Sequence, residues 1–264
     1  MFATVILGAA FVSGTVLLVL ACYFLMRQLE DKDPSSNTRD LANSVMLRIS
    51  ALHGLILALV FAQEMAEYQQ LKLESAIETN ALADIYFDAG RFGGNNPGLI
   101  TTPIRNYAQI VIEEEWDSLG ATGLLASRAW GQWDAAYNEI LDLIPATDRQ
   151  RSLRDHMLNR IHSIAETRVK REHHARNSLS LIFWFAAVSG VIFMGLAFYP
   201  YLPRRSNLVL LALLGGFTGI ILFFIYAFSN PFQDPGSWRP DDFRQVLRQF
   251  QHSTDGAPGA RGTM

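Results

Sequence analysis

The residues best suited to handling ions follow one face of a predicted helix that begins in the stretch ALHGLILALVFAQEMAEYQQ, residues 51–70. At about 100° per residue, an arc of roughly 100° holds apolar residues first and carboxylates afterwards. The members of this stripe are His53, Leu57, Val60, Glu64, Glu67, Leu71, Glu74, Glu78, Leu82 and Ile85. If several copies placed this face on a symmetry axis, Leu57 and Val60 would form a constriction that gates by dewetting. The carboxylates of Glu64, Glu67, Glu74 and Glu78 would then form stacked acidic rings that favour cations.

The same stripe has a simpler interpretation that needs no pore. Glu64 and Glu67 can sit at the level of the lipid headgroups, with the later glutamates on a solvated helix face. His53 is a candidate pH-sensitive element of a pore. A buried neutral histidine, hydrogen-bonded to a neighbouring helix, is the favoured interpretation of the same residue. Both interpretations of the stripe stay open at the level of the sequence.

Residues 162–176 carry three histidines among acidic and basic residues, which raises the question of a metal site. His173 and His174 are adjacent, and adjacent helical residues point about 100° apart. Glu166 is surrounded in sequence by Arg168, Lys170 and Arg171. A basic collar at the membrane interface is therefore favoured over a zinc site.

Three consecutive glutamates, Glu113 to Glu115, precede Trp116. They have no partnered nucleophile, base or metal ligand at a recognisable spacing. We interpret them as a solvated helix face with Trp116 packed inward. The sequence thus contains no catalytic constellation, and we expect neither an enzyme nor a bound cofactor or metal.

Composition indicates a membrane protein. Half of the 264 residues are hydrophobic and only 18% are charged, with a mean hydropathy of +0.13. The net charge of −3 is too small to indicate or exclude a nucleic-acid partner, but no basic block with interleaved aromatic residues appears, so we expect no nucleic-acid binding. The single cysteine, Cys22, excludes an intrachain disulfide and a cysteine-based zinc site.

The order of apolar and polar segments predicts an all-α integral membrane protein. It has four transmembrane helices and a helical extramembrane domain, formed partly by extensions of helices 2 and 3. The predicted segments are a first span at 1–26, a polar loop at 27–48, a second span at 49–63, the extramembrane domain at 64–177, a third span at 178–200, a basic loop at 201–207, a fourth span at 208–228, an exit segment with an amphipathic helix at 229–251, and a disordered tail at 252–264.

The distribution of proline, glycine and apolar residues within these segments predicts how the helices continue and pack. The stretch 49–88 lacks proline and predicts one helix that crosses the membrane and continues beyond it. Leu153, Met157, Ile161 and Ile164 mark an amphipathic helix that runs on into the third span. Glycines in the last span (Gly215, Gly216 and Gly219) allow close helix contact.

Several motifs, in their order and spacing, resemble the bestrophin-like family of bacterial and plant membrane proteins. They are ESAIETNALADIYFDAG at 74–90, IRNYAQIVIEEEWDSL at 104–119, an arginine-rich helix before the third span, and NPFQDPGSWRPDDFRQVL at 230–247. One departure is Asn230, where the family pattern usually carries an acid.

The resemblance implies a pentameric ion channel in the bilayer, with inorganic ions as its cargo and the second helix lining the pore. Leu57, Val60 and Phe61 are then the candidates for an apolar neck. Family analogy implies chloride, whereas the acidic stripe favours cations. The alternative is a non-conducting membrane scaffold or accessory subunit that binds a protein partner. We expect the plasma (inner) membrane of a bacterium. The charges of the short loops place the helical domain outside the cell and the analogy places it in the cytoplasm, so its side stays open.

Overall fold

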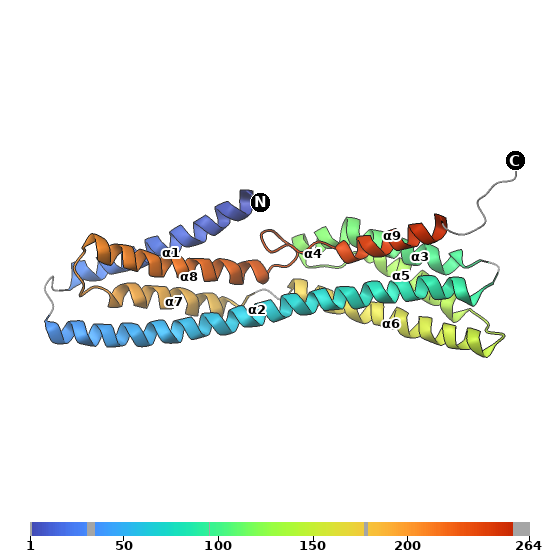
Figure 1. The fold of residues 1–264 in the computed structure, drawn as a ribbon, viewed down its shortest axis with the longest axis horizontal. Helices are drawn as coiled ribbons and strands as arrows, with labels where there is room; N and C mark the ends of the chain where they lie inside the picture. Colours follow the sequence, from blue (N-terminus) through green and yellow to red (C-terminus); the bar gives the residue numbers. More distant parts are fainter. Residues whose placement is uncertain (1, 31–34, 95, 177–178, 256–264) are drawn as a thin grey trace. The chain divides into compact units, whose positions relative to one another are not determined.

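The computed structural model describes residues 2–30, 35–94, 96–176 and 179–255, and within these residues every regular element is helical (Figure 1). This confirms the predicted fold class. The chain divides into two compact units, each of which combines separate stretches of sequence. The membrane unit consists of Met1–Tyr68 and Ser178–Ser237, and the helical unit of Gln69–Asn177 and Trp238–Met264.

The membrane unit contains α1 (Phe2–Leu29), the first part of α2 (Ser36–Phe92), α7 (Leu181–Ala197) and α8 (Arg205–Phe228). Among the described residues, α1, α2 and α8 are long and apolar enough to cross a membrane. A fourth span results if α7 is counted together with the helix before it as one broken span. The chain is therefore an integral membrane protein.

Glycines bring α1 into close contact with its neighbours in the membrane unit. A methyl group on Gly219 would lie 2.8 Å from the Phe11 carbonyl oxygen, and one on Gly195 would lie 2.6 Å from the Val19 carbonyl oxygen. Only a residue without a side chain lets the backbones approach this far. The expectation for Gly219 is thus confirmed, whereas a methyl group on Gly216 would meet Val16 at an ordinary 3.7 Å.

The predicted polar loop at 27–48 is wrong over most of its length. α1 continues to Leu29 and α2 begins at Ser36, so residues 36–48 are helical. The Ser35 hydroxyl accepts a hydrogen bond from the Thr38 backbone N–H at 3.3 Å, which satisfies a free donor at the start of α2. Residues 31–34 of the predicted loop lie outside the described residues.

The helical unit contains the second part of α2 and six further elements. These are α3 (Gly98–Ile110), a π-helical segment η1 (Val111–Glu115), α4 (Trp116–Thr122), α5 (Ser127–Leu141), α6 (Asp148–Arg176) and α9 (Asp241–Asp255). α2 ends where Gly93 and Gly94 take φ values of 76° and 122°. The core includes Met157, Ile161 and Ile164 of α6, which confirms the predicted amphipathic face.

Two predicted boundaries need correction. α6 ends at Arg176, and Leu179 and Ser180 are not helical, so the third span is not an unbroken extension of α6. The Ser180 hydroxyl instead caps α7 by accepting a hydrogen bond from the Ile182 backbone N–H at 3.2 Å. α9 continues to Asp255, so the prediction of disorder is wrong for residues 252–255. Residues 256–264 lie outside the described residues.

Candidate functional site

The face of α2 that the sequence predicts to line a pore is buried within the chain. Leu57 is 2% exposed and belongs to an apolar cluster formed with residues of α7 and α8. The buried members of this cluster are Leu57, Phe183, Ala187, Leu222 and Ile225. Val60 and Phe61 are partly buried against the same cluster. α2 therefore uses the face of Leu57, Val60 and Phe61 to pack against its own chain, and the apolar neck there stays a prediction from the sequence.

His53 continues this buried face toward the start of α2. It lies against Gly190 of α7, where an added methyl group would come within 2.6 Å of the imidazole Cγ. Gly190 thus provides the space that the ring fills. The structure agrees with a buried histidine, but the expected hydrogen bond is missing at Nε2, which has no partner among the described residues.

The four predicted ring carboxylates do not form one exposed row. Glu64 is buried in the membrane unit, and Glu67 accepts a hydrogen bond from Gln63 Nε2 at 3.1 Å. In the helical unit, Glu74 is buried with its Oε2 3.2 Å from His174 Nε2. Glu78 is 1% exposed in the core of that unit. Glu74 and Glu78 are thus covered by their own chain, and the acidic rings stay a prediction from the sequence.

Glu78 belongs to a buried ion cluster with Glu115, Arg168, Arg171 and Tyr107. Arg171 donates from Nη1 to Glu78 Oε2 and from Nη2 to Glu115 Oε1, each at 2.6 Å. The Tyr107 hydroxyl donates to Glu78 Oε1 at 2.6 Å. Arg168 forms a second ion pair with Glu115 and also donates to the Ala126 carbonyl oxygen at 2.6 Å. The formal charges of two arginines and two glutamates cancel, as buried charges require.

Aromatic rings enclose the guanidinium groups of this cluster. The Arg168 guanidinium carbon lies 4.3 Å from the centre of the Trp130 ring. That of Arg171 lies 5.4 Å from the Phe243 ring of α9 and 5.8 Å from the Trp116 ring. Such cation–π contacts are strongest where water is excluded. The cluster therefore joins α2, α3, η1, α5, α6 and α9 into one core.

The two carboxylates of the cluster have pKa values that are shifted in opposite directions. Burial raises the pKa of Glu78, and this effect outweighs the opposing attraction of Arg171. Burial also acts to raise the pKa of Glu115, but Arg171 and Arg168 together hold it below its usual value. Glu115 is therefore the firmly ionised partner, which fits its two guanidinium contacts.

This cluster corrects two predictions from the sequence. Glu115 was expected on a solvated face, and Arg168 and Arg171 in a basic collar at the membrane interface, yet all three are buried. Glu115 closes the π-helical segment η1, in which each turn contains an additional residue. This local change of period turns Glu115 inward, and a regular 3.6-residue pattern does not predict it. Trp116 is buried, as expected.

α2 has a second face that its own chain leaves open. Between Leu52 and Ile77, eight residues within an arc of roughly 80° are exposed and none of them is charged. We name them the exposed face of α2: Leu52, Leu55, Leu59, Gln63, Ala66, Gln70, Leu73 and Ile77. The spacing of its leucines was visible in the sequence. The carboxylates on the neighbouring face were the stronger signal, and for that reason the sequence predicts the pore on that face and not on the face of the leucines.

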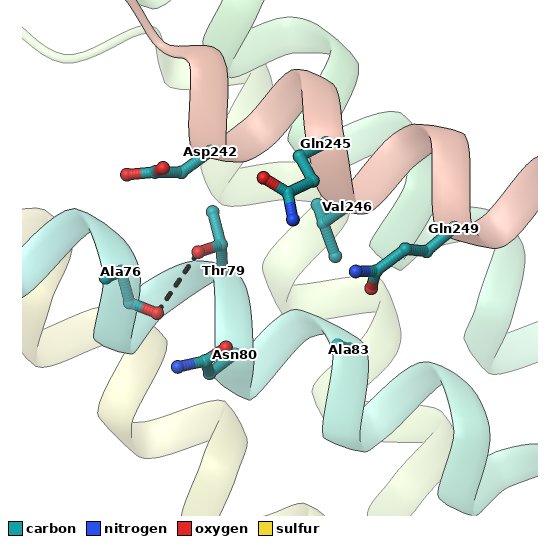
Figure 2. Close-up of a pocket in the computed structure, with 8 residues that line it drawn as sticks. All are labelled: Ala76, Thr79, Asn80, Ala83, Asp242, Gln245, Val246 and Gln249. Carbon is teal, nitrogen blue, oxygen red and sulfur yellow. Dashed lines mark hydrogen bonds between the residues drawn. The ribbon is translucent and has the colours of Figure 1, made fainter.

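The helical unit also has a polar groove between α2 and α9 (Figure 2). Its volume is about 140 Å³, and the side-chain amides of Asn80, Gln245 and Gln249 point into it. The Thr79 hydroxyl beside it already donates to the Ala76 carbonyl oxygen at 3.1 Å. Among the described residues, no group of three or more histidine, cysteine, aspartate or glutamate side chains could hold a metal ion.

Comparison with protein families identifies the chain. A model of the Bestrophin-like domain matches residues 13–243, which is most of the sequence. The chain belongs to the Bestrophin-like family. The resemblance seen in the sequence motifs is thereby confirmed, and members of this family are generally channels rather than enzymes. Searches of curated proteins and of solved structures found no match to this Bestrophin-like chain.

Proposed function

We propose that this Bestrophin-like protein is a homo-oligomeric ion channel, pentameric by family analogy, whose pore is lined by the exposed face of α2. The observation that carries the proposal is the continuation of this face from the membrane unit into the helical unit. Leu59 is 62% exposed in the membrane unit, where lipid could cover it. Leu73 is 55% exposed on the same face in the helical unit. The helical unit lies beyond the predicted spans, so the Leu73 side chain is covered either by water or by a second copy of the chain.

Leu52, Leu55 and Leu59 then replace Leu57, Val60 and Phe61 as the candidates for the apolar neck. Leucines at spacings of three and four project from one side of a helix, so copies around an axis would form successive apolar rings. Such a constriction gates by dewetting. Gln63 and Gln70, further along the same face, would supply neutral polar groups to ions on the side of the neck beyond Leu59.

The charges near this face favour anions. Arg48 is exposed one helical turn before Leu52 and projects from the same side of α2. A ring of arginines at the mouth of a pore attracts anions, whereas Glu64 is buried on the other face. We therefore propose chloride and similar anions as the permeating ions, in the plasma membrane of a bacterium.

Cysteine accessibility tests the pore face directly. In a Cys22→Ala background, Leu59→Cys and Leu57→Cys form a matched pair, exposed and buried respectively. A charged thiol reagent should reduce the current of the Leu59→Cys channel by more than about half, because a charge would enter the neck. The Leu57→Cys channel should be unaffected. The readout is planar-bilayer current from purified protein.

Each other outcome of this experiment counts against the proposal. Block of the Leu57→Cys channel alone would show that the pore is lined by the face of α2 that carries Leu57. Silence of the wild-type protein, shown to be folded, under all pH and calcium conditions would favour the scaffold that binds a protein partner. A monomer after gentle solubilisation would support that same conclusion.

Ion selectivity provides a second, separate prediction. In a KCl gradient the wild-type current should reverse near the chloride potential, and Arg48→Gln should move the reversal potential toward zero, since the arginine ring is removed. Glu64→Gln is the control and should leave the reversal potential unchanged. A shift in the Glu64→Gln channel only, with reversal near the potassium potential, would support the acidic-ring hypothesis and contradict anion selectivity.

A further inference from the structure

α1 ends at the same end of the membrane unit at which α7 connects to α8 (Figure 1). A pocket of about 320 Å³ lies at these residues. We name it the arginine pocket. It is lined by Arg39, Pro200, Tyr201, Leu202, Arg204, Ser206 and Asn207. The lining comes from the first turns of α2, from the α7–α8 connection and from the start of α8. We propose that this pocket binds a phosphate group, and that the phosphate belongs to the headgroup of an acidic phospholipid.

Side chains of α1 hold the α7–α8 connection that forms the wall of the pocket. The Tyr23 hydroxyl donates to the Tyr201 carbonyl oxygen at 2.7 Å. Arg27 Nη1 donates to the carbonyl oxygens of Tyr199 and Tyr201 at 3.1 and 3.3 Å. Asn207 Nδ2 donates to the Leu202 carbonyl oxygen at 2.9 Å. The wall is therefore fixed before any ligand binds, which lowers the entropic cost of binding.

The charge and chemistry of the lining select an anion. Two guanidinium groups, from Arg39 on α2 and Arg204 at the start of α8, line the pocket together with the Ser206 hydroxyl. Guanidinium forks pair with phosphate oxygens through two parallel hydrogen bonds, and this geometry makes arginine a preferred phosphate ligand.

The surroundings of the pocket favour a lipid over a free phosphate ion. Apolar side chains that follow Asn207 along α8 are exposed, including Val209, Leu210 and Leu213. Phe24, Leu25 and Leu29 of α1, at the same end of the unit, are also exposed. A phospholipid can lay its acyl chains along these residues while its headgroup enters the pocket. Basic pockets between membrane helices are known to bind acidic headgroups in this way. The inference does not depend on ion conduction.

The test is the thermal unfolding of the full-length protein in detergent, with added lipid or phosphate. Phosphatidylglycerol at about 100 times its dissociation constant should raise the Tm by about 5 °C. Phosphatidylcholine should raise it much less, because its choline cation is repelled by the arginines. Sodium phosphate, compared with sodium chloride at equal ionic strength, tests the free anion.

Two variants locate the binding site. Arg204→Gln removes one exposed guanidinium and should weaken phosphatidylglycerol binding by about tenfold or more. Arg204→Lys retains the charge and should recover part of the affinity. Arg48→Gln removes an exposed arginine of the same unit outside the pocket and should leave the affinity unchanged.

The possible results separate the sources of the phosphate. Stabilisation by sodium phosphate equal to that by phosphatidylglycerol would support the phosphate site and overturn the lipid assignment. Equal stabilisation by both lipids, or equal losses in Arg204→Gln and Arg48→Gln, would indicate non-specific attraction and overturn the site. The site is also overturned if neither phosphatidylglycerol nor phosphate stabilises the wild-type protein.

Discussion

Replacing Arg171 with methionine should destabilise the helical unit by about 3–5 kcal/mol, because the change leaves a buried carboxylate without its counter-charge. Arg171 bonds to Glu78 and Glu115, and both carboxylates are fully buried. Glu115 retains Arg168 in the variant, whereas Glu78 keeps only the hydroxyls of Tyr107 and Thr167. The measurement is the free energy of unfolding in detergent, followed by fluorescence of the tryptophans beside the cluster.

Lys170→Met is the matched control for Arg171→Met. Lys170 precedes Arg171 on α6, and its side chain is 47% exposed in an ion pair with Glu166. Exposed pairs of this kind contribute little to stability, because water and salt screen them, so the control should unfold almost as the wild type does. Equal losses in the two variants would show that the buried ion cluster does not contribute more than a surface pair.

The pH dependence of the Arg171→Met variant gives an independent check. Burial raises the pKa of Glu78, and the variant lacks the arginine that opposes this rise. A carboxyl group whose pKa is higher in the folded state binds its proton more tightly there. Its contribution is therefore fully present below the unfolded-state pKa and is lost as pH rises through the folded-state pKa. Relative to wild type, the variant should be least impaired in acid, and Glu78→Gln in the same chain should remove that dependence.

The sequence predicts the helices of this protein well, since long apolar runs locate the candidate membrane spans and periodicity locates the core face of α6. In the structure, His53, Leu57 and Glu64 of the predicted stripe on α2 are all buried. What the sequence cannot provide is the partner of that stripe, because helical periodicity separates the faces of a helix without saying what covers each one. Gly190 makes space for His53 but lies far from it in the sequence, and nothing in the residues around Gly190 indicates this contact.

The buried ion cluster was hidden from the sequence for two physical reasons. Glu78 and Arg171 are separated by 93 residues, and only the packing of α2 against α6 brings them together. Glu115 is the last residue of a π-helical segment, whose wider turn shifts the direction of its side chain. A single sequence read with the usual helical period therefore places these charges on the surface.

The motifs that resemble the Bestrophin-like family meet in this cluster. Glu78 comes from the first motif, and Tyr107, Glu115 and Trp116 come from the second. Arg168 and Arg171 belong to the arginine-rich helix before the third span. These residues form the core of the helical unit, so the motifs report a shared fold. The proposed pore face, by contrast, consists of leucine, isoleucine, alanine and glutamine at helical spacing, a pattern common to many membrane helices.

The membrane unit depends on close contact between α1 and α8. Gly219→Ala should therefore lower the free energy of unfolding of this unit by about 1–3 kcal/mol. The added methyl group would lie 2.8 Å from both the Phe11 carbonyl oxygen and the Val12 Cα. These atoms belong to the backbone of α1, which can yield only if the whole helix moves. We expect a lower free energy of unfolding and a lower Tm in detergent.

Gly216→Ala is the matched control, because its methyl group would meet the Val16 side chain at 3.7 Å, an ordinary contact distance. The two substitutions make the same chemical change on the same helix, three residues apart, and remove the same backbone freedom. Any difference between them therefore measures how tightly the α1 backbone lies against α8. Gly219→Ala as stable as Gly216→Ala would contradict that packing. Within a bilayer no hydrophobic force drives two helices together, so their association depends on close packing at small residues. Destabilisation of Gly219→Ala alone would show that α1 and α8 associate through such close contact between their backbones.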